Sequence, residues 1–359
     1  MVLPGLASAG GAGIAPAPDP EEGDGLTTLA PNEHIVGDYR SVHDALSALR
    51  TDTTTLTSQH PDHTFLPLPD VLREWQSAGI DPAILIDGIG LLRPRYAELG
   101  LHQLLPLDRV LVGVQSTRPG AFGGFHHRDQ GYRHLQMIAV ITRYGEMDTA
   151  LPATPDLALL DLLRAYAHDC LHYGSYRRYQ LRDGQVIRTQ YGINHRRSCG
   201  RTYSVPDRSD STITRNLGVV MEGACDREAR RITSKAAALH GVEITDRPHR
   251  FAFRDVTGHL DRSHLAEIEA AAVTAPDETQ AFLTSLGRYE TTVNRRYAHF
   301  LAEVGEAEAD ELHDTILTAV ISGNTAGLGT WLDSRHGPGA FAGLFLSRSY
   351  LDPDMSVTG

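Results

Sequence analysis

The sequence predicts an α+β fold, with a mixed β-sheet in the N-terminal half and a mainly helical C-terminal half. Two short runs rich in Val and Ile, at 110–115 and 135–142, have the composition of buried strands. A longer segment at about 155–176 repeats apolar residues at the three- and four-residue spacing of a helix. Further helical patterns follow at about 212–240 and over 259–335, so helices dominate after the strands.

Composition and charge exclude several classes of protein. Of the 359 residues, 41% are hydrophobic and 22% are charged, which is an ordinary globular mixture and excludes a wholly disordered or fibrous chain. The length allows two or three domains. Charged residues interrupt every apolar stretch well short of the roughly 20 residues that cross a bilayer. A net charge of −12 and a pI of about 5.8 argue against a general nucleic-acid binder.

The chain contains 18 histidines but only three cysteines. Three cysteines cannot build a disulfide framework and suit a reducing compartment, so any metal chemistry should rest on imidazole and carboxylate groups. Residues 1–31 are dense in Gly, Ala and Pro and contain no Lys or Arg. Because a secretory signal needs a basic start, we expect this segment to be a disordered tail and the protein to be cytoplasmic.

The first half of the chain has a readable order of elements. Helices are predicted at 41–50 and 69–78, before the two strands. The glycine-rich stretch 120–131 between the strands reads as a loop or hairpin connection; its chemically active side chains are His126, His127 and Asp129. Thr154-Pro155-Asp156 then marks a strong helix start, with an N-cap, a proline at the first helical position and an acid in the first turn.

The second half begins with a predicted hairpin over 178–204, where Asp183-Gly184 separates short runs containing Tyr, Val, Ile and Thr. A second long helix is predicted from Thr212 or Thr214 to about His240, closed by Gly241. The helices over 259–335 should be interrupted near three positions: Ala275-Pro276, Gly287 and Gly323.

The first long helix carries the sequence His168-Asp169-Cys170-Leu171-His172. Residues four apart lie one above the other on a helix, so both imidazoles face the same point, which is the geometry for two ligands of one divalent metal. Asp169 lies beside them, within reach of a metal-bound water but poorly placed to be a ligand. The arrangement is that of H-E-x-x-H, in which the acid acts as general base.

The second long helix carries two carboxylates, Glu222 and Asp226, that are also four apart and share a face. Glu222 could complete a set of two histidines and one glutamate with a fourth position open to water, which is the pattern of catalytic zinc. Asp226 would then accept the free N–H of a ligating histidine, a bond that fixes the tautomer and the ring orientation.

These motifs resemble the gluzincin type of zinc metallopeptidase, the thermolysin-like class, over about residues 105–240. In that class a helix with H-E-x-x-H precedes a helix with the pattern G-x-x-x-E-x-x-x-D, which here is Gly218, Glu222 and Asp226. The resemblance implies one Zn²⁺ ion per chain held by His168, His172 and Glu222. It also implies a zincin-like catalytic domain over 32–245, followed by a mainly helical subdomain over 246–359.

The sequence departs from that family at the general base, because Asp169 stands where the family has glutamate. The side chain is one methylene shorter, a loss of roughly 1.5 Å of reach. Misplacing a catalytic group by about 1 Å can reduce a rate on the order of a hundredfold. On position alone, the residues that could stabilise the transition state lie in the predicted hairpin: His195, Tyr203 and Tyr191.

The expected substrate is a peptide or protein, with no nucleic-acid or membrane partner. Residues 177–215 hold nine arginines against three aspartates, which is +6 within a chain of −12. If this segment borders the cleft, it favours an acidic substrate. The alternative is that these arginines pair with acids elsewhere in the protein.

Two other functions are compatible with the motifs. His168-Asp169 also reads as the dyad of an HD phosphohydrolase, with His134 and Asp226 as further ligands. Because HD domains are all-helical, a clear sheet before residue 150 would exclude that function. The third possibility is a catalytically inactive zincin-like scaffold that binds proteins, which the replacement at Asp169 favours.

Overall fold

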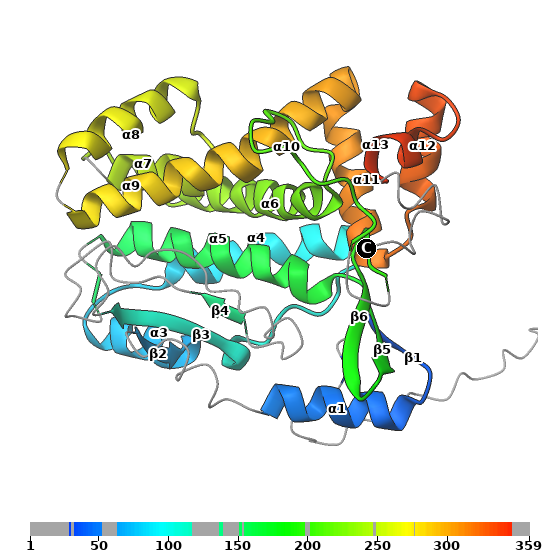
Figure 1. The fold of residues 1–359 in the computed structure, drawn as a ribbon. Helices are drawn as coiled ribbons and strands as arrows, with labels where there is room; N and C mark the ends of the chain where they lie inside the picture. Colours follow the sequence, from blue (N-terminus) through cyan, green and yellow to red (C-terminus); the bar gives the residue numbers. More distant parts are fainter. Residues whose placement is uncertain are drawn as a thin grey trace, which may run out of the picture.

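The protein combines two small β-sheets with a larger set of helices (Figure 1). The computed structural model describes residues 29, 32–51, 63–116, 136–138, 151–152, 154–197, 202–246, 249–275 and 277–346. Of the predicted tail 1–31, only residue 29 lies within the described part. The predicted loop 120–131, with His126, His127 and Asp129, lies outside it.

A three-stranded mixed sheet precedes the first long helix, as the sequence predicts. Strand β2 (His63–Pro67) pairs antiparallel with β3 (Val110–Ser116), which pairs parallel with β4 (Gln136–Ile138). The strand prediction at 110–115 is confirmed. That at 135–142 is confirmed for β4, and the rest of it lies outside the described residues. Strand β2 was not predicted, because its five residues include His63 and Pro67 and show no alternation.

The two long helices form the centre of the molecule. Helix α5 (Pro155–Gly174) lies between the three-stranded sheet and helix α6 (Leu217–Leu239) in Figure 1. Helix α5 begins at the predicted proline and ends two residues early, because Ser175 is extended. Helix α6 does not begin at Thr212 or Thr214. Asn216 is its N-cap, since its side chain accepts hydrogen bonds from the backbone N–H groups of Gly218 and Val219.

The predicted hairpin after α5 is present, but it belongs to a second sheet. Strands β5 (Arg177–Arg182) and β6 (Gln185–Tyr191) are joined at Asp183-Gly184, whose φ angles of 50° and 75° suit a tight hairpin turn. The short strand β7 (Asn194–His195) extends this sheet on one side, and β1 (Glu33–Val36) pairs parallel with β5 on the other. Strand β1 was not predicted, because four residues are too few for a periodic pattern.

The other helices agree with the sequence in part. Helices α1 (Tyr39–Thr51) and α3 (Leu68–Ser77) confirm the predictions at 41–50 and 69–78. Helix α4 (Ala83–Glu98) was missed: it contains two glycines and Pro94, which read as helix breakers, yet it packs beside α5. In the C-terminal half, the described helices are α7 (His249–Val256), α8 (Arg262–Thr274), α9 (Asp277–Tyr289), α10 (Arg295–Phe300), α11 (Ala309–Ser322), α12 (Ala326–His336) and α13 (Ala340–Phe345).

The predicted interruptions of these helices have different outcomes. Helix α8 ends at Thr274 and α11 ends before Gly323, whose φ of 68° is a left-handed helix cap. The predicted break at Gly287 is wrong. Helix α9 runs through that glycine and continues as a π-helical turn, Glu290–Asn294, into α10. Packing against the core therefore outweighs the weak helix propensity of one glycine.

Among the described residues, a large hydrophobic core includes Leu163 and Ala167 from α5 and Val220 and Ala224 from α6. A separate small cluster packs α1 against strand β5. The large core also includes Phe251 and later residues, so it continues across the predicted boundary at 245/246, and the division into two domains stays a prediction. None of the helices in the described part of the chain has both the length and the apolar character needed to cross a membrane.

Gly223 on α6 is a site where the close packing can be tested. A Cβ there would overlap the Cβ of Tyr297, which no rotamer change can move. We expect Gly223→Ala to lower the free energy of unfolding by about 1–2 kcal/mol in denaturant titrations, because overpacking outweighs the helix propensity gained. Gly90→Ala is the control. It lies in α4 with nothing within 4 Å of its Cβ, so it should stabilise the protein by up to about 1 kcal/mol. Equal effects of the two substitutions would contradict this packing.

Candidate metal centre

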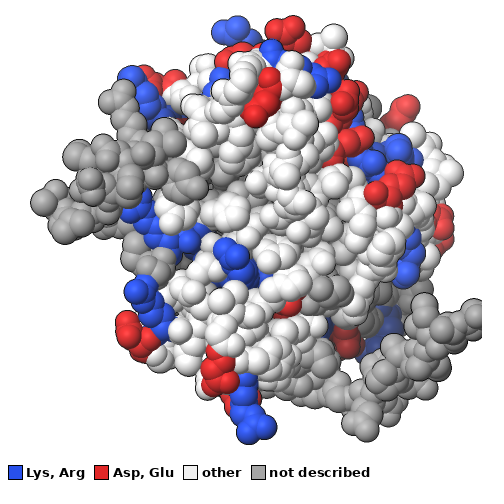
Figure 2. Space-filling view, turned by 90° about the vertical axis from the view of Figure 1, so that its right-hand side faces the viewer, with Lys and Arg blue, Asp and Glu red and all other residues white. Residues whose placement is uncertain are grey.

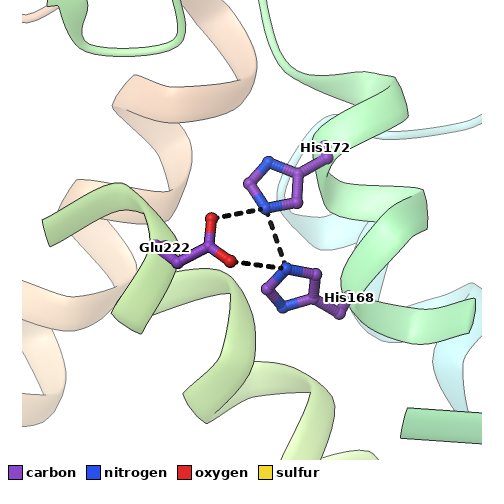
Figure 3. A group of neighbouring side chains, drawn as sticks. All are labelled: His168, His172 and Glu222. Atoms are coloured by element: carbon purple, nitrogen blue, oxygen red, sulfur yellow. Dashed lines mark hydrogen bonds and ion pairs between the residues drawn. The ribbon is translucent and has the colours of Figure 1, made fainter. Parts of the chain in front are cut away.

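Three side chains from α5 and α6 converge on one point (Figure 3). The Nε2 atoms of His168 and His172 are 2.9 Å apart. Glu222 reaches across from α6, with Oε1 at 3.2 Å from Nε2 of His168 and Oε2 at 3.1 Å from Nε2 of His172. The geometry therefore confirms the prediction that these three residues come together. Glu222 lies at least 50 residues after the two histidines along the chain.

The spacing of these donor atoms fits a small divalent ion. A tetrahedral zinc site with bonds of about 2.0–2.1 Å has neighbouring ligand atoms about 3.3 Å apart. The observed separations of 2.9 to 3.2 Å are close to that value. The histidines are buried, with 7% and 4% of their surface exposed, whereas the Glu222 side chain is 32% exposed. The centre is thus fixed on the histidine side and accessible on the glutamate side.

The local charges also favour a cation at this point. Burial opposes ionisation of Glu222, but the two imidazoles hold the pKa of its carboxyl group well below the usual range. In the described part of the chain, the contacts of Glu222 are the two histidines and the Tyr289 hydroxyl, at 3.4 Å, and no Arg or Lys pairs with it. An ionised carboxylate and two imidazoles therefore share a small space with no arginine or lysine beside the carboxylate in the described part of the chain.

A second group of possible ligands, Glu228, His313 and Asp314, differs in this respect. There, Arg95 places its Nε 2.8 Å from Glu228 and an Nη 2.6 Å from Asp314. One guanidinium group already pairs with both acids, so a metal ion there would have to compete with Arg95.

His172 is held from behind by a tyrosine. The hydroxyl of Tyr191, on β6, lies 2.7 Å from Nδ1 of His172. If Nε2 binds a metal, Nδ1 carries the ring proton and donates a hydrogen bond to the tyrosine oxygen. This hydrogen bond fixes the tautomer. Burial raises the pKa of Tyr191 to about 12, so the phenol stays neutral. The structure thus places the Tyr191 hydroxyl against the ring of His172, where it can position that ring; its predicted role as a transition-state donor stays a prediction.

Asp226 lies near His168, as predicted, but it does not form the predicted hydrogen bond with the histidine ring. Its Oδ1 lies 3.7 Å from Nδ1 of His168, which is longer than a hydrogen bond, and Nδ1 has no hydrogen-bond partner among the described residues. Asp226 instead forms ion pairs of 3.0 Å with Arg164 and 2.9 Å with Arg230. Burial would raise the pKa of Asp226, but these two arginines lower it, so its charge persists beside His168.

Tyr289, at the end of α9, also contacts the site. This contact was not predicted from the sequence. The Tyr289 hydroxyl donates to Oε1 of Glu222 at 3.4 Å, and the guanidinium carbon of Arg164 lies 5.8 Å from the tyrosine ring centre. The sequence offered one signal, a group of aromatic and basic residues near 289–299, but nothing connected it with Glu222, 67 residues earlier.

The three predicted catalytic residues lie in different places. Asp169 is buried in α5, three residues before His172, but it is not part of the group of converging donor atoms. His195 pairs with Gln190, so its side chain lies on the opposite face of the sheet from Tyr191, the residue that contacts His172. The ring of Tyr203 is contacted by Arg197, 5.2 Å from its centre. No contact described for His195 or Tyr203 joins either side chain to the metal ligands.

Some arginines of the segment 177–215 pair with acids, and at least one lies beside the candidate site. Three of the segment's arginines pair with acids, namely Arg177 with Glu33, Arg208 with Asp210, and Arg215 with Glu303. Arg188 lies 4.2 Å above the ring of Tyr191 and so stays close to the candidate site. The face of the molecule in Figure 2 carries charges of both signs, with basic side chains gathered to one side of its middle.

No family model, curated protein or solved structure matches this chain.

The role of Tyr191 can be tested by removing its hydroxyl. Tyr191→Phe should weaken zinc binding by about 10- to 100-fold, because His172 loses the acceptor that fixes its tautomer. The measurement is the zinc dissociation constant by competition with a chelator. The matched control is Tyr176→Phe, since Tyr176 stacks on His34 and does not contact the site. Unchanged affinity in Tyr191→Phe would show that the tyrosine does not support the ligand.

Proposed function

We propose that the protein is a metal-dependent hydrolase, and specifically a zinc metallopeptidase that binds one Zn²⁺ ion through His168, His172 and Glu222. The observation that carries the proposal is the convergence of two imidazole nitrogens and a carboxylate at 2.9 to 3.2 Å, with no arginine or lysine paired to the carboxylate in the described part of the chain. Two histidines and one glutamate are a ligand set of catalytic zinc, which keeps a fourth position open.

When bound, zinc would polarise the scissile carbonyl and lower the pKa of a water molecule towards about 7. The chain's own residues would do the rest. Asp169, adjacent to His168 and buried, would accept a proton on its carboxylate and pass it to the leaving amine. Tyr191 would hold the His172 ring in place. The hydroxyl of Tyr289, on the partly exposed side of the centre, is better placed to donate to bound substrate than His195 or Tyr203.

The substrate that fits best is a peptide with acidic character. The position of Arg188 against Tyr191 supports this choice, because it places a basic side chain beside the tyrosine that contacts His172. Cys170 and Cys225 are buried free thiols, which suits the reducing conditions of the cytoplasm.

The alternatives have less support. An HD phosphohydrolase is all-helical, whereas the sheet β2-β3-β4 precedes α5, and Asp226, its proposed metal ligand, is engaged by Arg164 and Arg230. His134, its upstream ligand, lies outside the described residues. The inactive scaffold differs from the enzyme only in activity, so the replacement at Asp169 is the reason to keep it as the second candidate.

Metal analysis of the purified protein tests the ligand set. We expect one zinc per chain in the wild type and less than about 0.1 in His168→Ala and in Glu222→Ala, because each removes one of three ligands. Asp314→Asn, in the cluster neutralised by Arg95, should keep a full equivalent. Substoichiometric metal in the wild type, or full zinc in both ligand variants, would refute the site.

Asp169→Asn separates the enzyme from the scaffold. The amide is nearly isosteric but cannot accept a proton, so cleavage of a peptide library should fall by at least about 100-fold while zinc content stays at one per chain. A wild type that binds zinc but cleaves no peptide would favour the scaffold. Equal cleavage by wild type and Asp169→Asn would remove Asp169 from the mechanism.

A further inference from the structure

The metal ligand His172 lies in the last turn of α5, which ends at Gly174. The last four carbonyl groups of a helix have no partner within the helix, and unless other groups bind them this turn frays. Here the carbonyl of Leu171 accepts a hydrogen bond from the Ser175 hydroxyl at 2.7 Å. The carbonyl of His172 accepts a hydrogen bond from the Ser175 backbone N–H at 3.3 Å, and it and the carbonyl of Gly174 are also bound by side chains from outside the helix. The position of a metal ligand therefore depends on those groups.

Two side chains provide this external capping. Arg177, at the start of β5, donates a hydrogen bond from its guanidinium group to the carbonyl of His172. Asn32, directly before β1, donates from its side-chain amide to the carbonyl of Gly174. A cation at the C-terminal end of a helix is also favoured by the helix dipole. Side chains from β5 and from the residue before β1 thus bind the backbone carbonyls of His172 and Gly174.

Arg177 is in turn held by strand β1. Its side chain is buried, and Nη1 lies 3.4 Å from Oε1 of Glu33, which also accepts a hydrogen bond from Tyr179 at 3.1 Å. The backbone N–H of Arg177 donates to the carbonyl of Asn32 at 2.8 Å. The guanidinium carbon lies 5.5 Å from the ring centre of Tyr191, whose hydroxyl contacts His172. One buried arginine therefore touches β1, the helix end and the tyrosine that supports the ligand.

We propose that Asn32, Glu33 and Arg177 form a clamp that positions His172, so that docking of β1 and zinc binding stabilise each other. This inference rests on the proposed metal site and extends it to a part of the chain about 140 residues away in sequence. The three are positioning residues, because they act on His172 through its backbone and through Tyr191. Coupling of this kind is reciprocal: a change in β1 that weakens zinc binding by some factor implies that zinc stabilises the docking of β1 by the same factor.

The first arm of the test measures zinc affinity in β1 variants. Asn32→Ala removes the cap on Gly174, and Glu33→Gln removes the carboxylate charge that pairs with Arg177, so each should raise the zinc dissociation constant by at least about fivefold. Val36→Ala is the matched control, because this residue is in the same strand but 46% exposed. Circular dichroism of each variant verifies that it is folded. Affinities equal to the wild type in both clamp variants would overturn the proposal while leaving the metal site intact.

The second arm measures the reverse effect, which a purely structural role would not produce. Backbone hydrogen exchange in residues 32–36 should slow by at least about fivefold when zinc is added to the wild-type protein. It should not change in Glu222→Ala, which lacks a ligand. If the wild type binds stoichiometric zinc and the exchange of this strand is the same with and without it, the clamp is refuted. If the wild type binds no zinc, the proposed metal site itself fails.

Discussion

The candidate site depends on the packing of α5 against α6. That contact brings the two imidazoles of α5 to the carboxylate of α6. Three groups with lone pairs lie about 3 Å apart in a largely buried space. Without a bound ion, this arrangement is stable only if protons are shared among the three groups. A divalent cation resolves the same electrostatic problem directly, and the contrast with the Arg95 cluster shows that the chain uses its own cations elsewhere. The apolar contacts between the two helices supply the free energy that holds the donors together.

The side chains around the three converging groups differ from one group to the next. Tyr191 binds the free nitrogen of His172, and Tyr289 donates to Glu222. Beside His168, the charge of Asp226 is held between Arg164 and Arg230, and Arg230 also pairs with Glu290 at 3.0 Å. That glutamate begins the π-helical turn directly after Tyr289. The charged network thus connects the ligand helices to the C-terminal helices, and π-helical turns of this kind are frequent at functional sites.

Local patterns in the sequence predicted which side chains meet between α5 and α6, since i, i+4 spacing on a capped helix depends on neighbouring residues alone. His168, His172 and Glu222 were found in this way, as was the turn at Asp183-Gly184. The supporting residues were harder to find, because their roles depend on tertiary contacts. Tyr191 shared its predicted hairpin with His195 and Tyr203. The alternation of side chains across β6 and β7 separates Tyr191 from His195, whereas Tyr203 lies outside both strands. Helix α4 and the continuity at Gly287 were missed because burial in the core outweighs the weak helix propensity of Gly and Pro.

The proposed site binds one zinc ion between α5 and α6 through imidazole and carboxylate groups, without a thiolate. X-ray absorption at the zinc edge of the loaded protein tests it most directly, because Cys225 lies on α6 between Glu222 and Asp226. The predicted result is a first shell of nitrogen and oxygen atoms at about 2.0–2.1 Å, with the multiple-scattering pattern of two imidazoles. A sulfur atom at about 2.3 Å, or a shell with fewer than two imidazoles, would contradict the account.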